Sequence, residues 1–254
     1  MKKLILSSIV LFAVLSLSGQ VGASMLIPAS EQGKNHWQAP GNSPVIGENG
    51  DLERVDFIHY AKPENPGKPI KPPKTESCYK LMGVKWKDFP INYVINPLNP
   101  EGLSENFVVS TIFSSTETWD DAVSMELVKD NYQIDYSSAY GAQDYKNAIV
   151  FGDYPNDNVI AVTSVWYSPR GKKIVEFDML FNTRFDWGDA SINSALMDLQ
   201  NIAVHEFGHG VGLSDLYNST CAEVTMYGYS TEGEIKKRTL EIPDINGLQA
   251  LYGI

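Results

Sequence analysis

The chain has 254 residues, of which 43% are hydrophobic and 20% are charged. This composition is typical of a folded globular protein and excludes a collagenous, coiled-coil or fully disordered chain. The formal net charge is -11, so a surface for duplex DNA or for an anionic membrane is not expected, because both need clustered basic residues. Only two cysteines are present, which excludes a disulfide-stapled miniprotein and a four-cysteine zinc site.

The first 23 residues predict a secretory signal. Lys2 and Lys3 precede an apolar stretch from Leu4 to Leu17, and a small-residue cleavage site follows at Val21-Gly22-Ala23. The apolar stretch has 14 residues, fewer than the roughly 20 that a membrane-spanning helix needs. We therefore expect export of the protein, and no stable membrane insertion once residues 1–23 are removed.

Residues 24–77 differ from the rest of the chain, because proline and glycine interrupt them often and apolar clusters are few. Prolines recur at every third position near the end of this range, which favours an extended polyproline II spacer, at Pro63, Pro66, Pro69 and Pro72. Two interpretations stay open. The segment is a linker that holds the folded part away from a surface, or it is a pro-segment that keeps the folded part latent until it is cut.

We expect the folded part to cover residues 78–254, where strand and helix patterns alternate. The expected elements, in chain order, are a strand at 91–95, a helix with its N-cap at Ser104, strands at 148–151, 159–167 and 174–181, a helix from near Ser191, and a helix opened by Pro243-Asp244. They predict an α+β domain with a twisted, mostly β sheet of about five strands backed by long helices.

A motif with metal-ligand spacing, His-Glu-Phe-Gly-His, occupies residues 205–209 near the end of the second predicted helix. His205 and His209 are four residues apart and lie on the same helix face, so both imidazoles can bind one zinc ion. Glu206 points about 100° away around the helix, beside the ion instead of on it, where a general base belongs. Glycines at 210 and 212 then allow the chain to double back.

The third metal ligand has several candidates. The other histidines, His36 and His59, precede the folded part, so the ligand is expected to be Asp215, Cys221 or Glu223. Asp215 is favoured, because it follows the glycine turn at a spacing that returns its carboxylate to the ion. The alternative for Asp215 is a helix-end residue that supports the ligands without binding the metal.

The residues from His205 to Asp215, followed by Thr225-Met226-Tyr227, resemble the metal site of the metzincin metallopeptidases, which have a methionine turn under the metal. In this family the third ligand is usually histidine, and aspartate in a few groups. Closer matches to the matrixin branch cover most of residues 78–254, namely Tyr79-x-Leu81, Trp119-Asp120-Asp121-Ala122, Glu176-Phe177-Asp178 and Asp244-Ile245-Asn246-Gly247. The resemblance implies a metzincin-like catalytic domain, with Met226 in the methionine turn.

The same resemblance implies a secreted zinc-dependent endopeptidase. One catalytic zinc ion would be bound by His205, His209 and Asp215, and Glu206 would be the general base that activates a water for attack on the peptide bond. The partners would be polypeptides, bound as an added strand along the sheet edge near residues 176–181. We expect a monomer that binds no nucleic acid. The alternative is a zinc-binding protein of the same fold without catalysis, which would be expected to lack the glutamate.

Two further expectations concern calcium and the cysteines. Calcium is an option without support, because the family's calcium motif has Phe181 in its last place. Acidic turn residues are expected to be solvated instead of binding a cation, and these are Asp144, Asp153 and Asp157. In an exported protein, Cys78 and Cys221 are expected to form a disulfide.

Overall fold

The computed structural model describes residues 45–46, 52–63 and 77–254. They all belong to one of the two units into which the chain divides, Asn35–Ile254. The predicted signal at 1–23 and most of the proline-rich segment lie outside the described residues. Among the described helices, none is long and apolar enough to cross a membrane.

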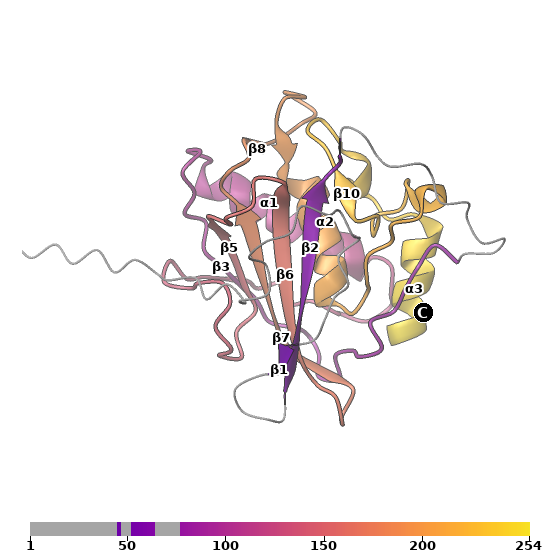
Figure 1. Ribbon diagram of the computed structural model, residues 1–254. Helices are drawn as coiled ribbons and strands as arrows, with labels where there is room; N and C mark the ends of the chain where they lie inside the picture. The colour runs from indigo at the N-terminus through magenta and orange to yellow at the C-terminus, as the bar shows by residue number, and fades with distance from the viewer. Residues whose placement is uncertain (1–44, 47–51, 64–76) are drawn as a thin grey trace, which may run out of the picture. The chain divides into compact units, whose positions relative to one another are not determined.

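Within the described residues, eight strands form one mixed sheet (Figure 1), in the order β1-β2-β6-β7-β5-β3-β4, with β10 pairing to β2. Their bounds are β1 Val45–Ile46, β2 Glu53–Ala61, β3 Val94–Ile95, β4 Gln133–Ile134, β5 Ala148–Gly152, β6 Val159–Ser168, β7 Lys173–Asn182 and β10 Tyr229–Ser230. Two short strands, β8 Trp187–Gly188 and β9 Met197–Asp198, pair separately.

Strand direction divides the sheet into two parts. Strands β4, β3, β5 and β7 pair in parallel, whereas β6 is antiparallel to both β7 and β2. In β6, every residue from Val159 to Trp166 is buried, because both faces of the strand are covered. Strand β6 pairs with one edge of β2, and β10 pairs with the other.

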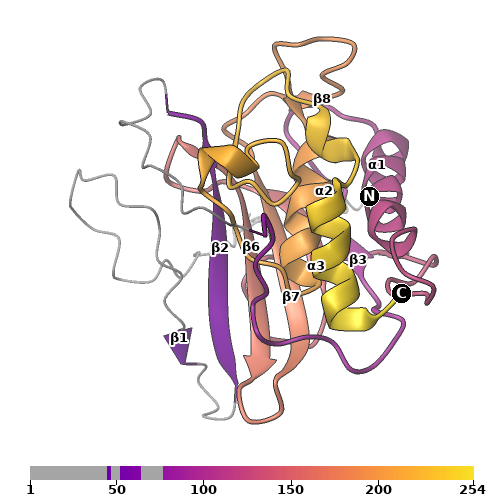
Figure 2. The same cartoon turned by 90° about the vertical axis from the view of Figure 1, so that its right-hand side faces the viewer.

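Three helices lie on one face of the sheet (Figure 2), α1 Glu105–Asp120, α2 Leu199–Gly210 and α3 Ile242–Tyr252. Ser104 caps α1 as predicted, because its side-chain oxygen accepts a hydrogen bond from the Phe107 backbone N–H. The indole N–H of Trp119 in α1 donates to the Val204 carbonyl in α2 at 2.8 Å, which fixes the two helices to each other. Two short 3-10 helices complete the elements, Ser219–Cys221 and Lys236–Arg238.

The predicted start of the second helix near Ser191 is wrong. Helix α2 begins at Leu199, with Asp198 as its N-cap. The backbone N–H and the hydroxyl of Ser191 both bond to the side chain of Asp189, and such local side-chain contacts stabilise a turn at the expense of a helix. The strands predicted at 148–151, 159–167 and 174–181 and the last helix are present.

Strand β2 was not predicted. It comes from the proline-rich segment, outside the range 78–254 that was expected to fold. Its side chains alternate, with Val55, Phe57 and His59 buried between more exposed neighbours. This period of two is the signal of a half-buried strand, and the frequent prolines on its C-terminal side obscured it.

The expected disulfide between Cys78 and Cys221 is present. It connects residues separated by 143 positions in the sequence, and it attaches the start of the segment 77–254 to the chain just before Met226. The segment 77–254 therefore has the expected α+β plan, with strands of a mixed sheet packed against three helices.

Candidate metal centre

The last turns of α2 carry His205, Glu206 and His209, and their exposed fractions are 0%, 0% and 1%. Gly208 lies between them on the face toward Met226. A Cβ atom at Gly208 would stand 2.2 Å from the Met226 sulfur, so only glycine lets the helix and the methionine turn approach this closely. The two histidines are thus held in a helix that is packed on all sides.

Each of the two histidines has a fixed ring orientation. The Nδ1 atom of His205 lies 2.7 Å from the Thr225 carbonyl oxygen, and that of His209 lies 3.0 Å from the Leu213 carbonyl oxygen. A carbonyl oxygen only accepts, so both Nδ1 atoms carry the proton and donate. Both Nε2 atoms therefore present lone pairs, and they face each other at 3.1 Å.

The carboxylate of Asp215 completes this group. Its Oδ1 atom lies 3.2 Å from His205 Nε2 and 3.4 Å from His209 Nε2. The same oxygen is buried and has no hydrogen-bond partner among the described residues. With both histidines neutral, three lone-pair atoms converge here, and a bound cation would satisfy all three, because a buried unpaired acceptor is costly.

The spacing of these three atoms fits zinc. Ligands held about 2.0–2.1 Å from a tetrahedral zinc ion stand roughly 3.3–3.4 Å apart, close to the 3.1, 3.2 and 3.4 Å observed. Two imidazoles and one carboxylate are also a donor set that zinc accepts. His205, His209 and Asp215 are therefore a candidate zinc site.

Two turns bring Asp215 to the histidines. At Gly212 the backbone has φ +104, and a Cβ atom there would stand 2.8 Å from the Val84 carbonyl oxygen, so glycine is required for this turn. The chain then runs back along the end of α2, where the Leu213 N–H donates to the Gly208 carbonyl at 2.8 Å. This turn places Asp215, the favoured candidate for the third metal ligand, beside the two histidines.

The other candidates for a third ligand are placed elsewhere. Cys221 is in the disulfide. The side chain of Glu223 is 82% exposed and pairs with Lys236 at 3.3 Å. Neither side chain is available to the histidines of α2.

Glu206 is held by hydrogen bonds on both oxygens. Its Oε2 accepts from the Thr163 hydroxyl of β6 at 2.5 Å, and its Oε1 lies 3.0 Å from Nδ1 of His59 in β2. Burial raises the pKa of Glu206 to about 7, although His209 and the Thr163 hydroxyl act in the opposite direction. Sequence analysis did not identify Thr163 or His59 as part of this site.

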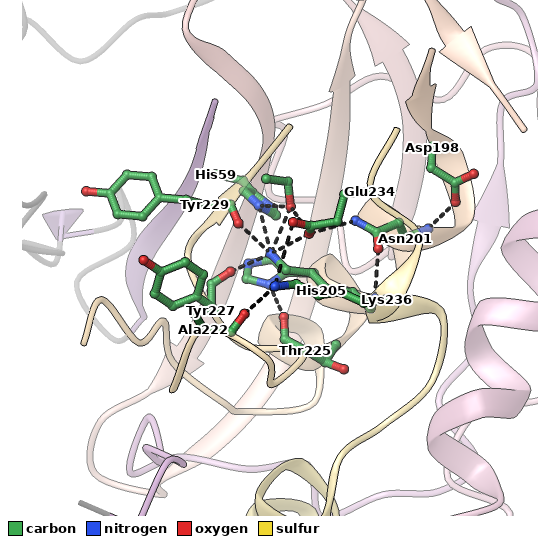
Figure 3. A network of polar contacts seen from close by, with 12 residues as sticks. His59, Asp198, Asn201, His205, Ala222, Thr225, Tyr227, Tyr229, Glu234 and Lys236 are labelled. Carbon is green, nitrogen blue, oxygen red and sulfur yellow. Dashed lines mark hydrogen bonds and ion pairs between the residues drawn. The ribbon is translucent and has the colours of Figure 1, made fainter. Parts of the chain in front are cut away.

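His59 lies against the candidate metal site and was excluded from it on the basis of sequence. Its ring centroid is 4.0 Å from that of His205, and the two residues are seen together in Figure 3. Burial, followed by the charges of His205 and Lys237, holds the pKa of His59 well below its usual value. The neutral ring donates from Nδ1 to Glu206 and presents Nε2 to Lys237 at 3.3 Å.

Lys237 is a second buried residue that the sequence did not reveal. Its exposed fraction is 0%, and its ammonium donates to the carbonyls of Tyr227 and Tyr229 and to the hydroxyl of Ser230. Burial lowers the pKa of this ammonium to about 8. The side chain fixes the segment 227–230, which contains β10, beside the end of β2.

The methionine turn is anchored to α3. Asp244 accepts hydrogen bonds from the backbone N–H groups of Thr225 at 2.9 Å and Met226 at 3.2 Å. Thr225 in turn supplies the carbonyl that orients His205. Helix α3 therefore positions a metal-site histidine through the turn.

The acidic residues of the segment 176–178 and of the exposed turns have protein partners. Glu176 accepts from the backbone N–H groups of residues 144 and 145, and Asp178 from those of residues 141 and 148. On the exposed turn, Arg184 pairs with both Asp153 and Asp157. The backbone N–H of Lys146 donates to Asp144.

The predicted substrate edge at 176–181 is wrong. These residues belong to β7, which is paired on one side with β5 and on the other with β6. Neither edge of β7 is free to accept an added strand. The long strand that the segment 77–254 places next to β2 is β6, and its outer edge is where β2 lies.

Comparison with known proteins agrees with the geometry. Residues 85–253 match the matrixin family, Peptidase_M10. The chain is 28% identical over 178 residues to the hatching enzyme of Paracentrotus lividus, 30% over 169 residues to the metalloendoproteinase 2-MMP of Arabidopsis thaliana, and 29% over 171 residues to the neutrophil collagenase of Homo sapiens.

These alignments cover 69%, 64% and 67% of this chain, and 27%, 41% and 34% of the three relatives. The chain thus spans about a quarter to two fifths of the length of the relatives it matches. The matched region contains α2, the buried His205, His209 and Asp215 cluster, the methionine turn and α3. The chain belongs to the matrixin family of zinc metalloendopeptidases, with an aspartate in its candidate zinc site.

Proposed function

We propose that this chain is a secreted zinc endopeptidase that hydrolyses internal peptide bonds of proteins, with zinc bound by His205, His209 and Asp215. The proposal rests mainly on one observation: three buried atoms, Nε2 of His205, Nε2 of His209 and Oδ1 of Asp215, lie within 3.4 Å of one another. The buried Glu206 follows His205 directly in α2. The predicted signal at residues 1–23 and the disulfide support export, since disulfides persist in oxidising compartments.

Zinc supplies two kinds of chemistry when bound at such a site, acidification of a water and polarisation of the scissile carbonyl. Glu206 accepts the proton of the attacking water and passes it to the leaving amine nitrogen. The Thr163 hydroxyl, bonded to Oε2 of Glu206, holds the carboxylate in one orientation for both transfers.

The substrate backbone binds along the β6 edge. The substrate peptide takes the place that β2 has in the structure, antiparallel to β6 and parallel to β10. An extended peptide between the two pairs through its main chain, which accepts many sequences. This arrangement suits a protein substrate more than a small molecule.

The test compares the wild-type chain with Glu206→Gln, each loaded with one zinc ion per chain. Hydrolysis of a denatured protein is measured before and after the chain is cut between residues 63 and 77. We expect cleavage by the wild type and a loss of at least about 10²-fold in the variant, because proton transfer by a positioned group contributes that much. If the zinc-loaded wild type cleaves nothing in either form, the non-catalytic zinc-binding alternative replaces this proposal.

A further inference from the structure

We propose that Tyr217 is a positioning residue of the candidate metal centre, which binds one oxygen of Asp215 and thereby leaves the other oxygen to the cation. This inference rests on the proposed function in one respect, since it takes Asp215 to be a zinc ligand. It assigns a role to a side chain that lies outside the motif from His205 to Asp215.

A carboxylate ligand has a freedom that an imidazole ligand lacks. Its two oxygens are equivalent, so a cation can be bound by either one or by both. His205 and His209 have no such choice, because Nδ1 of each ring donates to a carbonyl oxygen and only Nε2 is left to the cation. The aspartate needs a donor on one of its oxygens to have a single way of binding.

The hydroxyl of Tyr217 is such a donor. It donates to Oδ2 of Asp215 at 3.2 Å. The other oxygen, Oδ1, has no hydrogen-bond partner among the described residues, and it faces the Nε2 atoms of His205 and His209. The two oxygens of one carboxylate thus have different environments. Because an oxygen that already accepts a hydrogen bond is a weaker donor to a metal ion, the cation is directed to Oδ1.

The path of the chain after the glycine turn places the two side chains together. Residues 215–217 run beside the methionine turn, because the Leu216 N–H donates to the Met226 carbonyl at 2.9 Å. The Gly228 N–H donates to the Leu216 carbonyl at the same distance. Alternate side chains of an extended segment point to the same side. Leu216 packs against the core, so Asp215 and Tyr217 share the other side.

The ring of Tyr217 has room beside Asp215 because residue 228 is glycine. A Cβ atom at Gly228 would stand 2.5 Å and 2.8 Å from two ring atoms of Tyr217, and 3.0 Å from Oδ1 of Asp215. The ring also packs against that of Tyr229, with a centroid distance of 5.2 Å and an interplanar angle of 65°. The backbone at 228 and the Tyr229 ring therefore confine the ring whose hydroxyl reaches Asp215.

The hydrogen bond lies at a site that is largely closed to solvent. Asp215 is 5% exposed, and the two histidines that it faces are 0% and 1% exposed. Without the hydroxyl, Oδ2 would be a second unpaired acceptor beside Oδ1, which is costly in a buried place. The carboxylate would then rotate or bind the cation through both oxygens. Either change alters the metal coordination while the three ligand residues stay the same.

The direct test compares the zinc affinity of the full chain with that of Tyr217→Phe, by competition with a chelator. We expect a loss of about 10–100-fold, the usual cost of removing a hydrogen-bond partner of a metal ligand. The phenyl ring keeps the packing but no longer donates to Oδ2. The matched control is Tyr79→Phe, which removes a hydroxyl from the same surface pocket and keeps the bond between Tyr217 and Asp215. The control should bind zinc as the wild type does, and an equally unchanged affinity of Tyr217→Phe would contradict the proposal.

A second comparison shows whether Tyr217 acts through Asp215. In an Asp215→Ala background the carboxylate is absent, so Tyr217→Phe should lower the zinc affinity no further, as expected for two residues that share one interaction. Equal losses in the two backgrounds would mean that Tyr217 affects the site by another route. The positioning role would then be wrong.

Cobalt(II) bound in place of zinc reports the coordination itself. The visible absorption of Co²⁺ is strong when four ligand atoms surround the ion tetrahedrally and weaker when a fifth is added, and sites of this kind can expand to five. We expect weaker absorption in Tyr217→Phe, since Oδ2 is then free to join Oδ1. The unfolding midpoint of the metal-free protein in urea should stay unchanged. A lower midpoint together with an unchanged spectrum would give Tyr217 a purely structural role and overturn the proposal.

These measurements need no catalysis, so the inference and the proposed function fail separately. If Tyr217→Phe binds zinc more weakly but the zinc-loaded wild type cleaves no protein substrate, the positioning role holds and the peptidase proposal fails. If the wild type cleaves while Tyr217→Phe has the zinc affinity and the cobalt spectrum of the wild type, the peptidase proposal holds and Tyr217 does not position Asp215.

Discussion

Gly208 shows how one residue sets the geometry of the candidate site. It has no side chain where α2 meets the methionine turn, and an added Cβ would stand 2.2 Å from the Met226 sulfur and 2.9 Å from the Trp119 ring. The sequence motif allows any residue at this position between the two histidines. The packing against Met226 and Trp119, which no local pattern reveals, is what requires glycine.

We expect Gly208→Ala to destabilise the protein by about 1–3 kcal/mol, the usual cost of overpacking a core. Helix propensity alone predicts the opposite, a gain of about 1 kcal/mol for alanine, so the sign of the change is informative. The free energy of unfolding is measured by urea denaturation, with Gly171→Ala on an exposed turn as the control. A stabilised Gly208→Ala variant would show that the approach of helix and turn is looser than described.

A second prediction about a single residue concerns Asp215. Its Oδ1 has no partner among the described residues other than the converging histidine atoms, and we propose that it binds the cation. We expect Asp215→Ala to lower zinc affinity by more than about 100-fold, since the loss of residues that only support ligands already costs 10–100-fold. Competition with a chelator measures the affinity, and Glu223→Ala serves as the exposed acidic control. An unchanged affinity would mean that Asp215 is not a ligand.

At the scale of elements, the fold was predicted where one local pattern decides the structure. The N-cap of α1 and the strands β5, β6 and β7 follow from capping chemistry and apolar runs. The start of α2 was missed because the turn that precedes it is made by the side chain of Asp189. Strand β2 was missed because its alternation precedes a proline-rich stretch, and its partner β6 lies about a hundred positions later in the sequence.

The candidate site was likewise predicted only in part from the sequence. The ligand residues of α2 and Asp215 are recognisable from spacing within eleven residues. His59, Thr163 and Lys237 come from three other elements, and only the tertiary structure brings them to Glu206. The substrate edge was placed on β7 instead of β6 because strand order in a sheet does not follow from the order of strands in the sequence.

A prediction at the scale of elements concerns Asp244, which connects α3 to the methionine turn. Its carboxylate accepts from the backbone N–H groups of Thr225, Met226 and Glu241. We expect Asp244→Ala to cost about 3 kcal/mol or more of unfolding free energy, because each buried N–H left without a partner costs roughly 1–3 kcal/mol. Urea denaturation measures this cost, and Asp186→Ala, at an exposed position, is the control. A loss below 0.5 kcal/mol, within the range of ordinary surface changes, would contradict the anchoring role.

For the whole molecule, a single covalent link spans the catalytic segment. The disulfide between Cys78 and Cys221 connects residues 143 positions apart, and the loop between them includes the strands β3 to β7, α1 and α2. The candidate zinc ligands precede Cys221 in the sequence, and the methionine turn follows it. The stability of the candidate site is therefore coupled to that of the entire segment.

Replacing both cysteines with serine should lower the unfolding free energy by about 2–5 kcal/mol, as for native disulfides in exported domains. Denaturant unfolding of the zinc-loaded protein measures the change, and reduction of the wild type by dithiothreitol should have a similar effect. Should both treatments leave the unfolding midpoint unchanged, the link would contribute nothing to the stability of the folded protein.

The most direct test of the central claim is a crystal structure of the zinc-loaded full chain with diffraction data collected at the zinc absorption edge. We expect one anomalous peak, about 2.0–2.2 Å from Nε2 of His205, Nε2 of His209 and an oxygen of Asp215. A second group of potential ligands, His59, His205 and Glu206, lies next to the first. A peak at that second group would contradict the account, because Glu206 would then be a metal ligand instead of the general base.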